Sequence, residues 1–182
     1  MQARRSDQRL LGPFLVLAGL VGLWASFELV LAKFATLDDP DAALGCDFSI
    51  IVQCGANLTS AQGEVFGFPN PLLGLAGFVA PVAVGVALLA GATFARWFWL
   101  ALQAGVTAGM AFVAWLIGQS IYVLGTLCPW CMVVWAVMIP LFWTVTLRNA
   151  AAGALGAGVQ RAGAYLLTWI VPLTLACYLL IA

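Results

Sequence analysis

Five long apolar stretches decide what this chain can fold into. They run over about residues 10–32, 71–94, 97–127, 128–147 and 162–182. A helix needs about 20 apolar residues to cross the hydrocarbon core of a bilayer, and each stretch is long enough. Lipid offers no partner to the backbone of an open strand, so all five stretches are predicted to be helices. We therefore expect an all-α membrane protein whose residues 1–182 form a single domain with five transmembrane helices.

Composition agrees with this expectation and narrows the chemistry. Hydrophobic residues make up 64% of the chain and charged residues only 8%, whereas soluble domains carry about 25% charged residues. The formal net charge is zero, which gives no reason to expect a nucleic-acid partner. The chain has no histidine, which excludes Ser-His catalysis, Cys-His catalysis and histidine-ligated metals. Disulfide chemistry needs only thiols and remains available.

Basic residues indicate how the helices are oriented. With five spans, six of the seven basic residues fall on one side of the membrane: Arg4, Arg5, Arg9, Arg96, Arg148 and Arg161. Lysine and arginine concentrate on the cytoplasmic side of membrane proteins. The N-terminus is therefore predicted to be cytoplasmic. The loop over residues 33–70, the junction between the third and fourth spans and the C-terminus are predicted to be extracytoplasmic.

The long loop carries helix-start signals. Thr59 and Gln62 have the spacing of a capping box, which predicts a short helix over about residues 60–66. Asn70 and Pro71 follow, and they are expected to cap the second span and to occupy its first helical position.

Four of the five cysteines fall on the predicted outer side. Cys46 and Cys54 lie in the loop, and Cys128 and Cys131 form Cys-Pro-Trp-Cys at the outer end of the fourth span. An extracytoplasmic compartment is oxidising. The spacing places Cys128 and Cys131 on one helical face at a helix N-terminus, which favours the reactive thiolate, although burial opposes this effect. Cys177 stands alone in the fifth span and is expected to be an inert packing residue.

The cysteines and Glu28 are also compatible with other roles. Two structural disulfides would explain Cys46 and Cys54, but a disulfide across two residues closes a tiny loop and stabilises little. A four-thiolate zinc site usually needs two short Cys-x-x-Cys motifs, so no metal is expected. A transporter is disfavoured because the spans hold almost no ionisable residue except Glu28. Glu28 is either an interfacial carboxylate or part of a proton route.

Several motifs occur in a fixed order over about residues 10–147. They are Cys46-Asp47 with Cys54, then Ser60, then Phe66-Gly67-Phe68-Pro69-Asn70-Pro71, then Cys128-Pro129-Trp130-Cys131. Their order, spacing and placement resemble the vitamin K epoxide reductase family in its bacterial form. The resemblance implies a four-helix bundle around a quinone, capped by the loop and its short helix, with the fifth helix at the periphery.

The resemblance also implies roles for the cysteines. Cys128 and Cys131 would be the active-site pair, with Cys131 next to the quinone ring. Cys46 and Cys54 would be the shuttle pair that passes electrons to them. The quinone would be menaquinone or ubiquinone.

Three further residues are implied at the quinone. Asn70 matches a family asparagine that hydrogen-bonds a quinone oxygen, and a helix cap is the plain alternative. Ser60 matches a family serine near the loop helix, where first-turn capping is the alternative. Trp135 stands where animal relatives have a tyrosine in contact with the quinone, but an indole can only donate a hydrogen bond.

The function implied is that of a thiol:quinone oxidoreductase in a bacterial inner or plasma membrane. It would reoxidise a thioredoxin-like partner and so support disulfide formation in secreted proteins. Some bacterial relatives carry a fused thioredoxin-like domain, and the 182 residues here hold none, so the partner is expected to be a separate protein. Reduction of a vitamin K epoxide by the same cysteines and a non-catalytic scaffold with structural disulfides are the alternatives.

Overall fold

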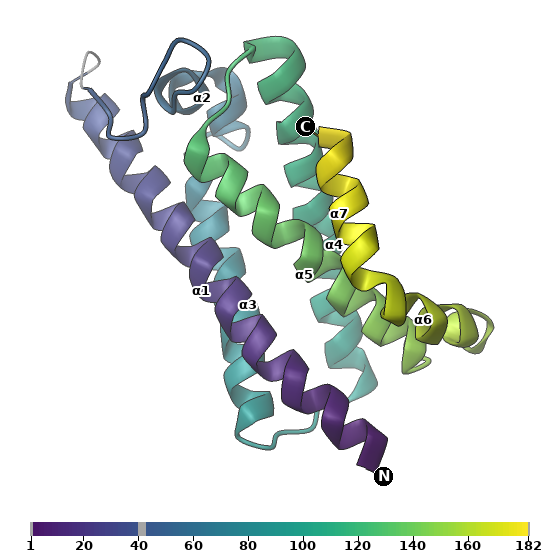
Figure 1. The fold of residues 1–182 in the computed structure, drawn as a ribbon. Helices are drawn as coiled ribbons and strands as arrows, with labels where there is room; N and C mark the ends of the chain where they lie inside the picture. The colour runs from purple at the N-terminus through teal and green to yellow at the C-terminus, as the bar shows by residue number, and fades with distance from the viewer. Residues whose placement is uncertain (1, 40–42, 182) are drawn as a thin grey trace.

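The protein is built almost entirely from α-helices. The computed structural model describes residues 2–39 and 43–181. The long helices are α1 (Gln2–Asp38), α3 (Pro71–Leu89), α4 (Arg96–Gly118) and α5 (Pro129–Ala151), and the last span is divided into α6 (Gln160–Leu166) and α7 (Ile170–Ile181). A short helix, α2 (Gly55–Thr59), lies at one end of the bundle (Figure 1). In the described ranges, five helical stretches are long and apolar enough to cross a membrane, which confirms the predicted all-α multi-pass membrane protein.

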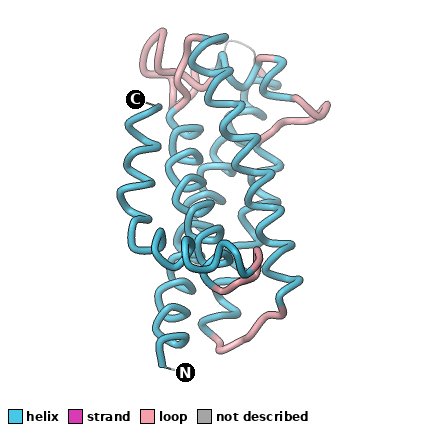
Figure 2. Tube along the Cα trace, turned by 90° about the vertical axis from the view of Figure 1, so that its right-hand side faces the viewer, coloured by secondary structure: helices cyan, strands magenta, loops and turns pink. Residues whose placement is uncertain are grey.

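Four of the spans surround a cavity, and the last one lies outside it. The cavity is lined from α1, α3, α4 and α5, with α2 and the turn after it closing one end. The helices α6 and α7 pack against the far side of α5 and contribute no described residue to the lining. Seen from the side, the spans run alongside one another and the connecting loops gather at the two ends (Figure 2). The bundle with a peripheral fifth span is therefore as predicted.

Prolines begin two of the spans, as the sequence predicts. Pro71 is the first residue of α3 and Pro129 is the first residue of α5, where the missing N–H of proline costs no hydrogen bond. The third span ends earlier than predicted. It continues from α4 through a π-helical turn (Gln119–Leu124), and Gly125 then adopts φ +65°, a left-handed conformation that glycine reaches without steric cost. This turn brings the chain back to Cys128 at the start of α5.

The helices of the long loop differ from the prediction. The helix expected over residues 60–66 is replaced by α2, which ends at Thr59, and by a 3₁₀ turn over Ala61–Glu64. Thr59 does not open a capping box, because its hydroxyl donates to the Gly55 carbonyl one turn earlier, 2.9 Å away. The prediction was wrong in position because helical hydrogen bonding starts directly after Cys54.

Asn70 stands at the N-cap position of α3, as predicted, but the capping bond expected of its side chain is not made. Its backbone is already helical, with φ −55° and ψ −33°, and its side chain makes no capping bond. The amide Nδ2 instead donates to the Gln62 carbonyl at 2.6 Å, and Oδ1 accepts from the Val65 N–H at 3.2 Å. The side chain therefore fastens the loop to the start of α3.

An ion pair between the buried Lys33 and the exposed Glu64 holds the same loop over the end of α1. That helix runs past residue 32, its predicted end, and carries Lys33 with only 6% of its surface exposed. The Lys33 ammonium donates to the Leu58 carbonyl at 2.8 Å and pairs with the Glu64 carboxylate at 2.7 Å. A charge can be buried when it is paired and hydrogen-bonded in this way. The pair allows α1 to continue beneath the loop.

Glycines allow α1 and α3 to approach closely along their length. A Cβ on Gly85 of α3 would lie 2.8 Å from the Gly12 carbonyl oxygen and 2.9 Å from the Val16 nitrogen of α1. Small residues at such contacts are the usual device for packing helices tightly in lipid, where apolar burial gives little driving force. The two helices that carry the ends of the long loop are therefore packed backbone to backbone.

The close approach of α1 and α3 gives a stability prediction with a matched control on the same helix. Gly85→Ala should lower the free energy of unfolding by about 1–3 kcal/mol, because the new methyl group meets rigid backbone. Gly77→Ala should leave it unchanged or raise it slightly, because a Cβ there meets nothing within 4 Å. Thermal unfolding of both variants in detergent checks this. Equal stability of the two variants would contradict the packing described here.

Candidate functional site

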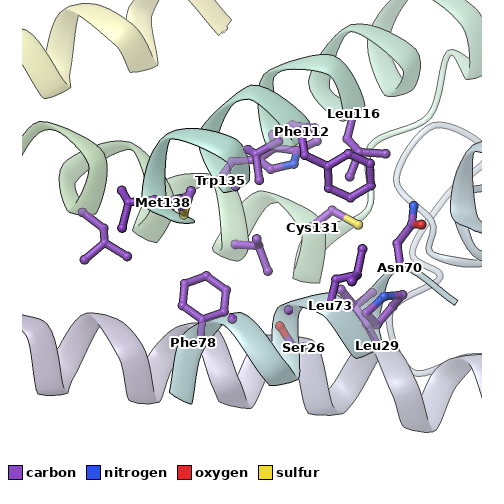
Figure 3. A pocket seen from close by; sticks show the side chains of 18 of the residues that line it. Ser26, Leu29, Asn70, Leu73, Phe78, Phe112, Leu116, Cys131, Trp135 and Met138 are labelled. Atoms are coloured by element: carbon purple, nitrogen blue, oxygen red, sulfur yellow. The ribbon is translucent and has the colours of Figure 1, made fainter. Parts of the chain in front are cut away.

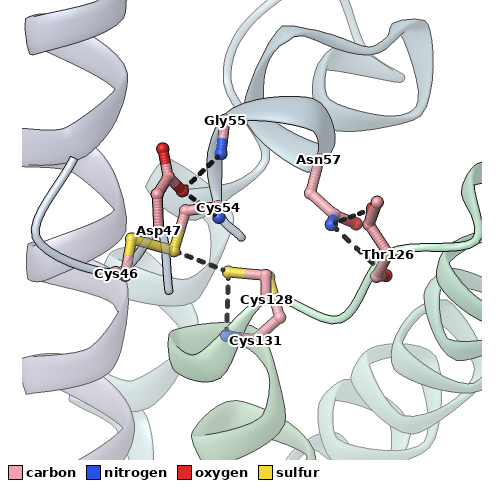
Figure 4. Close-up of a disulfide and its surroundings, with 8 residues drawn as sticks. All are labelled: Cys46, Asp47, Cys54, Gly55, Asn57, Thr126, Cys128 and Cys131. Atoms are coloured by element: carbon pink, nitrogen blue, oxygen red, sulfur yellow. Dashed lines mark hydrogen bonds between the residues drawn. A yellow bond between two sulfur atoms is a disulfide. The ribbon is translucent and has the colours of Figure 1, made fainter. Parts of the chain in front are cut away.

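Sulfur atoms of four cysteines gather below α2, where the long loop meets the start of α5. Cys46 and Cys54 form a disulfide, and Cys128 and Cys131 are free thiols. The Cys128 Sγ lies 3.2 Å from the Cys54 Sγ (Figure 4). Cys54 and Cys128 are fully buried, and Cys46 is 5% exposed. The contact between the two pairs therefore runs through Cys54 and Cys128.

The Asp47 carboxylate fixes the position of Cys54. Its Oδ1 accepts hydrogen bonds from the backbone N–H groups of Cys54, at 2.7 Å, and Gly55, at 3.3 Å (Figure 4). A carboxylate at the start of a helix satisfies N–H groups that have no partner within the helix. Asp47 thus holds the disulfide and the start of α2 together. The sequence marked Asp47 as part of a motif but gave no sign of this contact.

Cys128 occupies the N-cap position of α5, and its environment favours the thiolate. Its Sγ accepts from the Cys131 backbone N–H at 3.5 Å. Hydrogen bonding from the Cys131 thiol is the main cause that lowers the pKa of Cys128, with help from backbone N–H groups of Cys131 and Trp130. Burial and the negative charge of Asp47 oppose the shift, but the pKa still falls below that of an ordinary thiol. This is the direction that the helix N-terminus predicts.

Cys131 faces a large cavity inside the bundle. The cavity has a volume of about 680 Å³, and most of the side chains around it are apolar. Figure 3 shows the Cys131 sulfur pointing toward the end of the cavity where Asn70 lies. Cys128 is not among the lining residues. Two cysteines only one helical turn apart therefore have different neighbours: Cys128 contacts the disulfide and Cys131 contacts the cavity.

All the residues predicted to contact a quinone line this cavity. They are Ser60, Asn70, Cys131 and Trp135. Asn70 uses one hydrogen of its Nδ2 on Gln62, and an amide NH₂ has a second hydrogen to donate. Trp135 is buried, with 6% exposure, one turn beyond Cys131 on α5.

Ser60 is engaged within the loop itself. Its hydroxyl donates to the Asn57 carbonyl at 2.8 Å and accepts from the Gly63 N–H at 3.2 Å. Ser60 is the N-cap of the 3₁₀ turn that follows α2. Its clearest role in the structure is therefore to hold the loop helices in shape at the edge of the cavity.

The remaining reactive groups lie apart from this arrangement or add little to it. Cys177 accepts a hydrogen bond from the Trp143 indole N–H at 3.4 Å, in contact with α5 and away from the other cysteines. Glu28 lines a smaller hollow of about 330 Å³ that also reaches Cys46 and Trp130. Ligand atoms of Cys46, Asp47 and Cys54 lie within 4.8 Å of one another. The disulfide between the two sulfurs leaves no thiolate there to bind a metal.

A comparison with known protein families gives a match that contains the residues of this site. The sequence model of the Vitamin K epoxide reductase family matches residues 13–146. Comparison with curated proteins produces no match. The matched segment covers more than half of the chain, and it includes both cysteine pairs and all the residues that line the cavity near Cys131. The chain therefore belongs to the vitamin K epoxide reductase family of membrane oxidoreductases.

Proposed function

We propose that the protein passes electrons from a separate thioredoxin-like protein, through its two cysteine pairs, to a quinone in the membrane. The reoxidised partner would then form disulfides in secreted proteins. The observation that carries this proposal is the division between neighbouring thiols. Cys128 lies 3.2 Å from the Cys54 sulfur, whereas Cys131 lines the apolar cavity.

The protein steps are thiol–disulfide exchanges that need no metal and no histidine. A thiolate of the partner attacks Cys46, breaks its bond to Cys54 and releases Cys54 as a thiolate. The second partner thiol then displaces Cys46 and leaves the partner oxidised. Cys54 attacks Cys128 in the oxidised Cys128–Cys131 pair, which releases the Cys131 thiolate. Cys46 resolves the Cys54–Cys128 bond, so two electrons have moved to Cys128 and Cys131.

The cavity suits a quinone with an apolar tail. Small-molecule sites are mostly apolar hollows of about 300–1,000 Å³ with a few polar groups, and this one holds Asn70 and Cys131 at one end. Its lining extends from Phe98 on α4 to Gln119 at the start of the π-helical turn, about 30 Å at a rise of about 1.5 Å per residue. A bound quinone would accept two electrons and two protons. Cys131 would deliver the electrons, and Cys128 would close the disulfide with it.

Quinone reduction by purified protein in which Cys46 and Cys54 form their disulfide and Cys128 and Cys131 are thiols tests the function directly. One equivalent of menaquinone or ubiquinone should be converted to quinol as Cys128 and Cys131 become a disulfide. Cys131→Ser should abolish this single turnover. Cys128→Ser should also block quinol formation. It should in addition give a visible absorption band, because the Cys131 thiolate is then held against an electron-poor ring with no thiol to resolve it.

The two serine variants also distinguish the roles of the thiols. A visible band in Cys131→Ser but not in Cys128→Ser would reverse the two roles. Absence of quinol formation by wild-type protein that is folded and binds quinone would refute the proposed function.

The route between the pairs gives a cross-linking prediction. With Cys177 replaced by serine, the variant Cys46→Ser/Cys131→Ser keeps only Cys54 and Cys128, whose sulfurs are in contact. Mild oxidation should convert it rapidly to a disulfide that shifts its mobility on a non-reducing gel. The matched variant Cys54→Ser/Cys131→Ser keeps Cys46 and Cys128 and should cross-link much more slowly. Equal rates would place Cys46 in the transfer step and refute the order of events.

The proposed orientation puts the cysteine cluster on the extracytoplasmic side of the membrane. The basic residues Arg96 and Arg148 lie at the opposite ends of α4 and α5 from the cysteines, which supports a cytoplasmic location for that end. In a bacterial inner or plasma membrane, the partner would therefore reach Cys46 from the oxidising side.

Labelling of intact cells with an impermeant maleimide tests the orientation. In a variant whose native cysteines are serine, Ile50→Cys should be labelled without permeabilisation, because Ile50 is 88% exposed in the loop beside the disulfide. Val159→Cys, between α5 and α6 and 45% exposed, is the matched control at the other end. It should be labelled only after permeabilisation. The reverse pattern would invert the topology and remove the extracytoplasmic role.

A further inference from the structure

Three polar side chains join the loop that carries Cys54 to the segment that leads into Cys128. We call Asn57, Ser120 and Thr126 the polar clasp. The Asn57 amide Nδ2 donates to the Thr126 hydroxyl at 3.0 Å (Figure 4). The Ser120 Oγ lies within hydrogen-bond distance of the Thr126 carbonyl, at 2.5 Å, and of the Asn57 Oδ1, at 3.1 Å. Ser120 is 2% exposed and Thr126 is 8% exposed.

Two residues of the clasp are close in sequence to the cysteines whose sulfurs are in contact, Cys54 and Cys128. Asn57 is on α2, which begins directly after Cys54, and Thr126 lies two residues before Cys128. A backbone contact runs beside it: the Gln53 N–H donates to the Leu127 carbonyl at 3.0 Å. The contacts therefore lie on both sides of Cys54, and both of them hold the two residues that directly precede Cys128.

The irregular backbone at the end of α4 brings Ser120 and Thr126 to the clasp. Ser120 lies in the π-helical turn that extends α4, and Thr126 follows Gly125 after the chain reverses. Single π-turns within helices are uncommon and often accompany functional sites. Neither hydroxyl has solvent as a substitute partner, and in a buried setting a lost hydrogen bond leaves the other groups unsatisfied. The position of Cys128 is therefore coupled to Asn57 through the Thr126 hydroxyl, at 3.0 Å, with the Thr126 carbonyl as a longer second acceptor at 3.5 Å.

We propose that the polar clasp positions the two cysteine pairs for electron transfer from Cys54 to Cys128. The inference rests on the proposed function and deepens it. In the transfer, the Cys54 thiolate bonds to the Cys128 sulfur, the Cys128–Cys131 bond breaks and Cys131 leaves as a thiolate. The reaction needs the attacking sulfur to meet Cys128 in line with the bond that breaks. Misplacement of reacting groups by about 1 Å can cost about a hundredfold in rate. Asn57 and Ser120 also line the cavity, whereas Thr126 does not. No clasp residue takes part in the exchange between the sulfurs, so for this step they are positioning residues.

The test uses the rate of cross-linking between Cys54 and Cys128, which needs neither quinone nor partner. In the Cys46→Ser/Cys131→Ser/Cys177→Ser background, Thr126→Val should slow the cross-link about five- to tenfold, because one buried hydrogen bond is lost with little change in shape. Thr126→Ser keeps the hydroxyl and should stay within about twofold of the parent. Ser120→Ala removes the other hydroxyl and should slow the cross-link as Thr126→Val does.

Two controls separate positioning from general damage. Thr59→Val alters an exposed threonine of α2 whose hydroxyl bonds only within that helix, and it should leave the cross-linking rate unchanged. In a chain with its native cysteines, Thr126→Val should also leave single-turnover quinone reduction by the reduced protein within about twofold of wild type, because that step follows the transfer at Cys128 and Thr126 does not line the cavity.

The outcomes that would overturn the proposal are distinct from a failure of the proposed function. Unchanged cross-linking in Thr126→Val and Ser120→Ala would refute the positioning role. Slowing of cross-linking and quinone reduction by the same factor in Thr126→Val would show a structural defect instead. A wild-type protein that cross-links as expected but forms no quinol would refute quinone reduction and leave the role of the clasp supported.

Discussion

Lipid offers no hydrogen-bond partner to an exposed backbone, and this constraint organises the whole molecule. Every segment inside the bilayer must be helical, so irregular chain is confined to the ends of the bundle. The long loop between α1 and α3 and the turn between α4 and α5 lie at the same end. The loop carries Cys46 and Cys54, and the turn ends at Cys128, with Cys131 in the first turn of α5. The membrane therefore concentrates the redox groups at one end of the bundle, where two segments distant in sequence are forced to pack together.

The start of α5 separates two chemical environments within one helical turn. Cys128, before the first residue of the helix, meets the loop disulfide and has its pKa lowered by hydrogen bonds. Cys131, inside the helix, meets the apolar cavity. Thiol–disulfide exchange needs an accessible thiolate, whereas a quinone needs an apolar hollow with few polar groups. The Cys-x-x-Cys spacing places one thiol in each environment while keeping the two close enough to form a disulfide.

Much of this arrangement could be predicted from the sequence, because the signals are local or strongly patterned. Apolar length predicted the spans, proline predicted the starts of α3 and α5, and the order of motifs led to the four cysteines and the family. The predictions that failed concern the loop. Thr59 bonds within α2 and Asn70 bonds to Gln62, so local capping patterns were overruled by contacts that the folded loop creates.

The contacts that hold the loop in place could not have been predicted. Asn57 and Thr126 are 69 residues apart in sequence, and no periodicity connects them. Lys33 looked like a residue that should end the first span, yet its pairing with Glu64 lets α1 continue to Asp38. Polar pairs of this kind depend on where separate helices finally meet, and a single sequence carries no record of that.

The glycine contacts between α1 and α3 have a mechanical consequence for the loop that joins them. The loop begins on α1 and ends on α3, and these helices pack backbone to backbone at Gly85. The two ends of the loop are therefore held at a fixed separation. Any movement that exposes Cys46 to a partner must then arise within the loop, in the chain around α2. The packing of α1 against α3 need not change during such a movement. The apolar interior of the bundle can then keep its structure while thiol–disulfide exchange takes place in the loop.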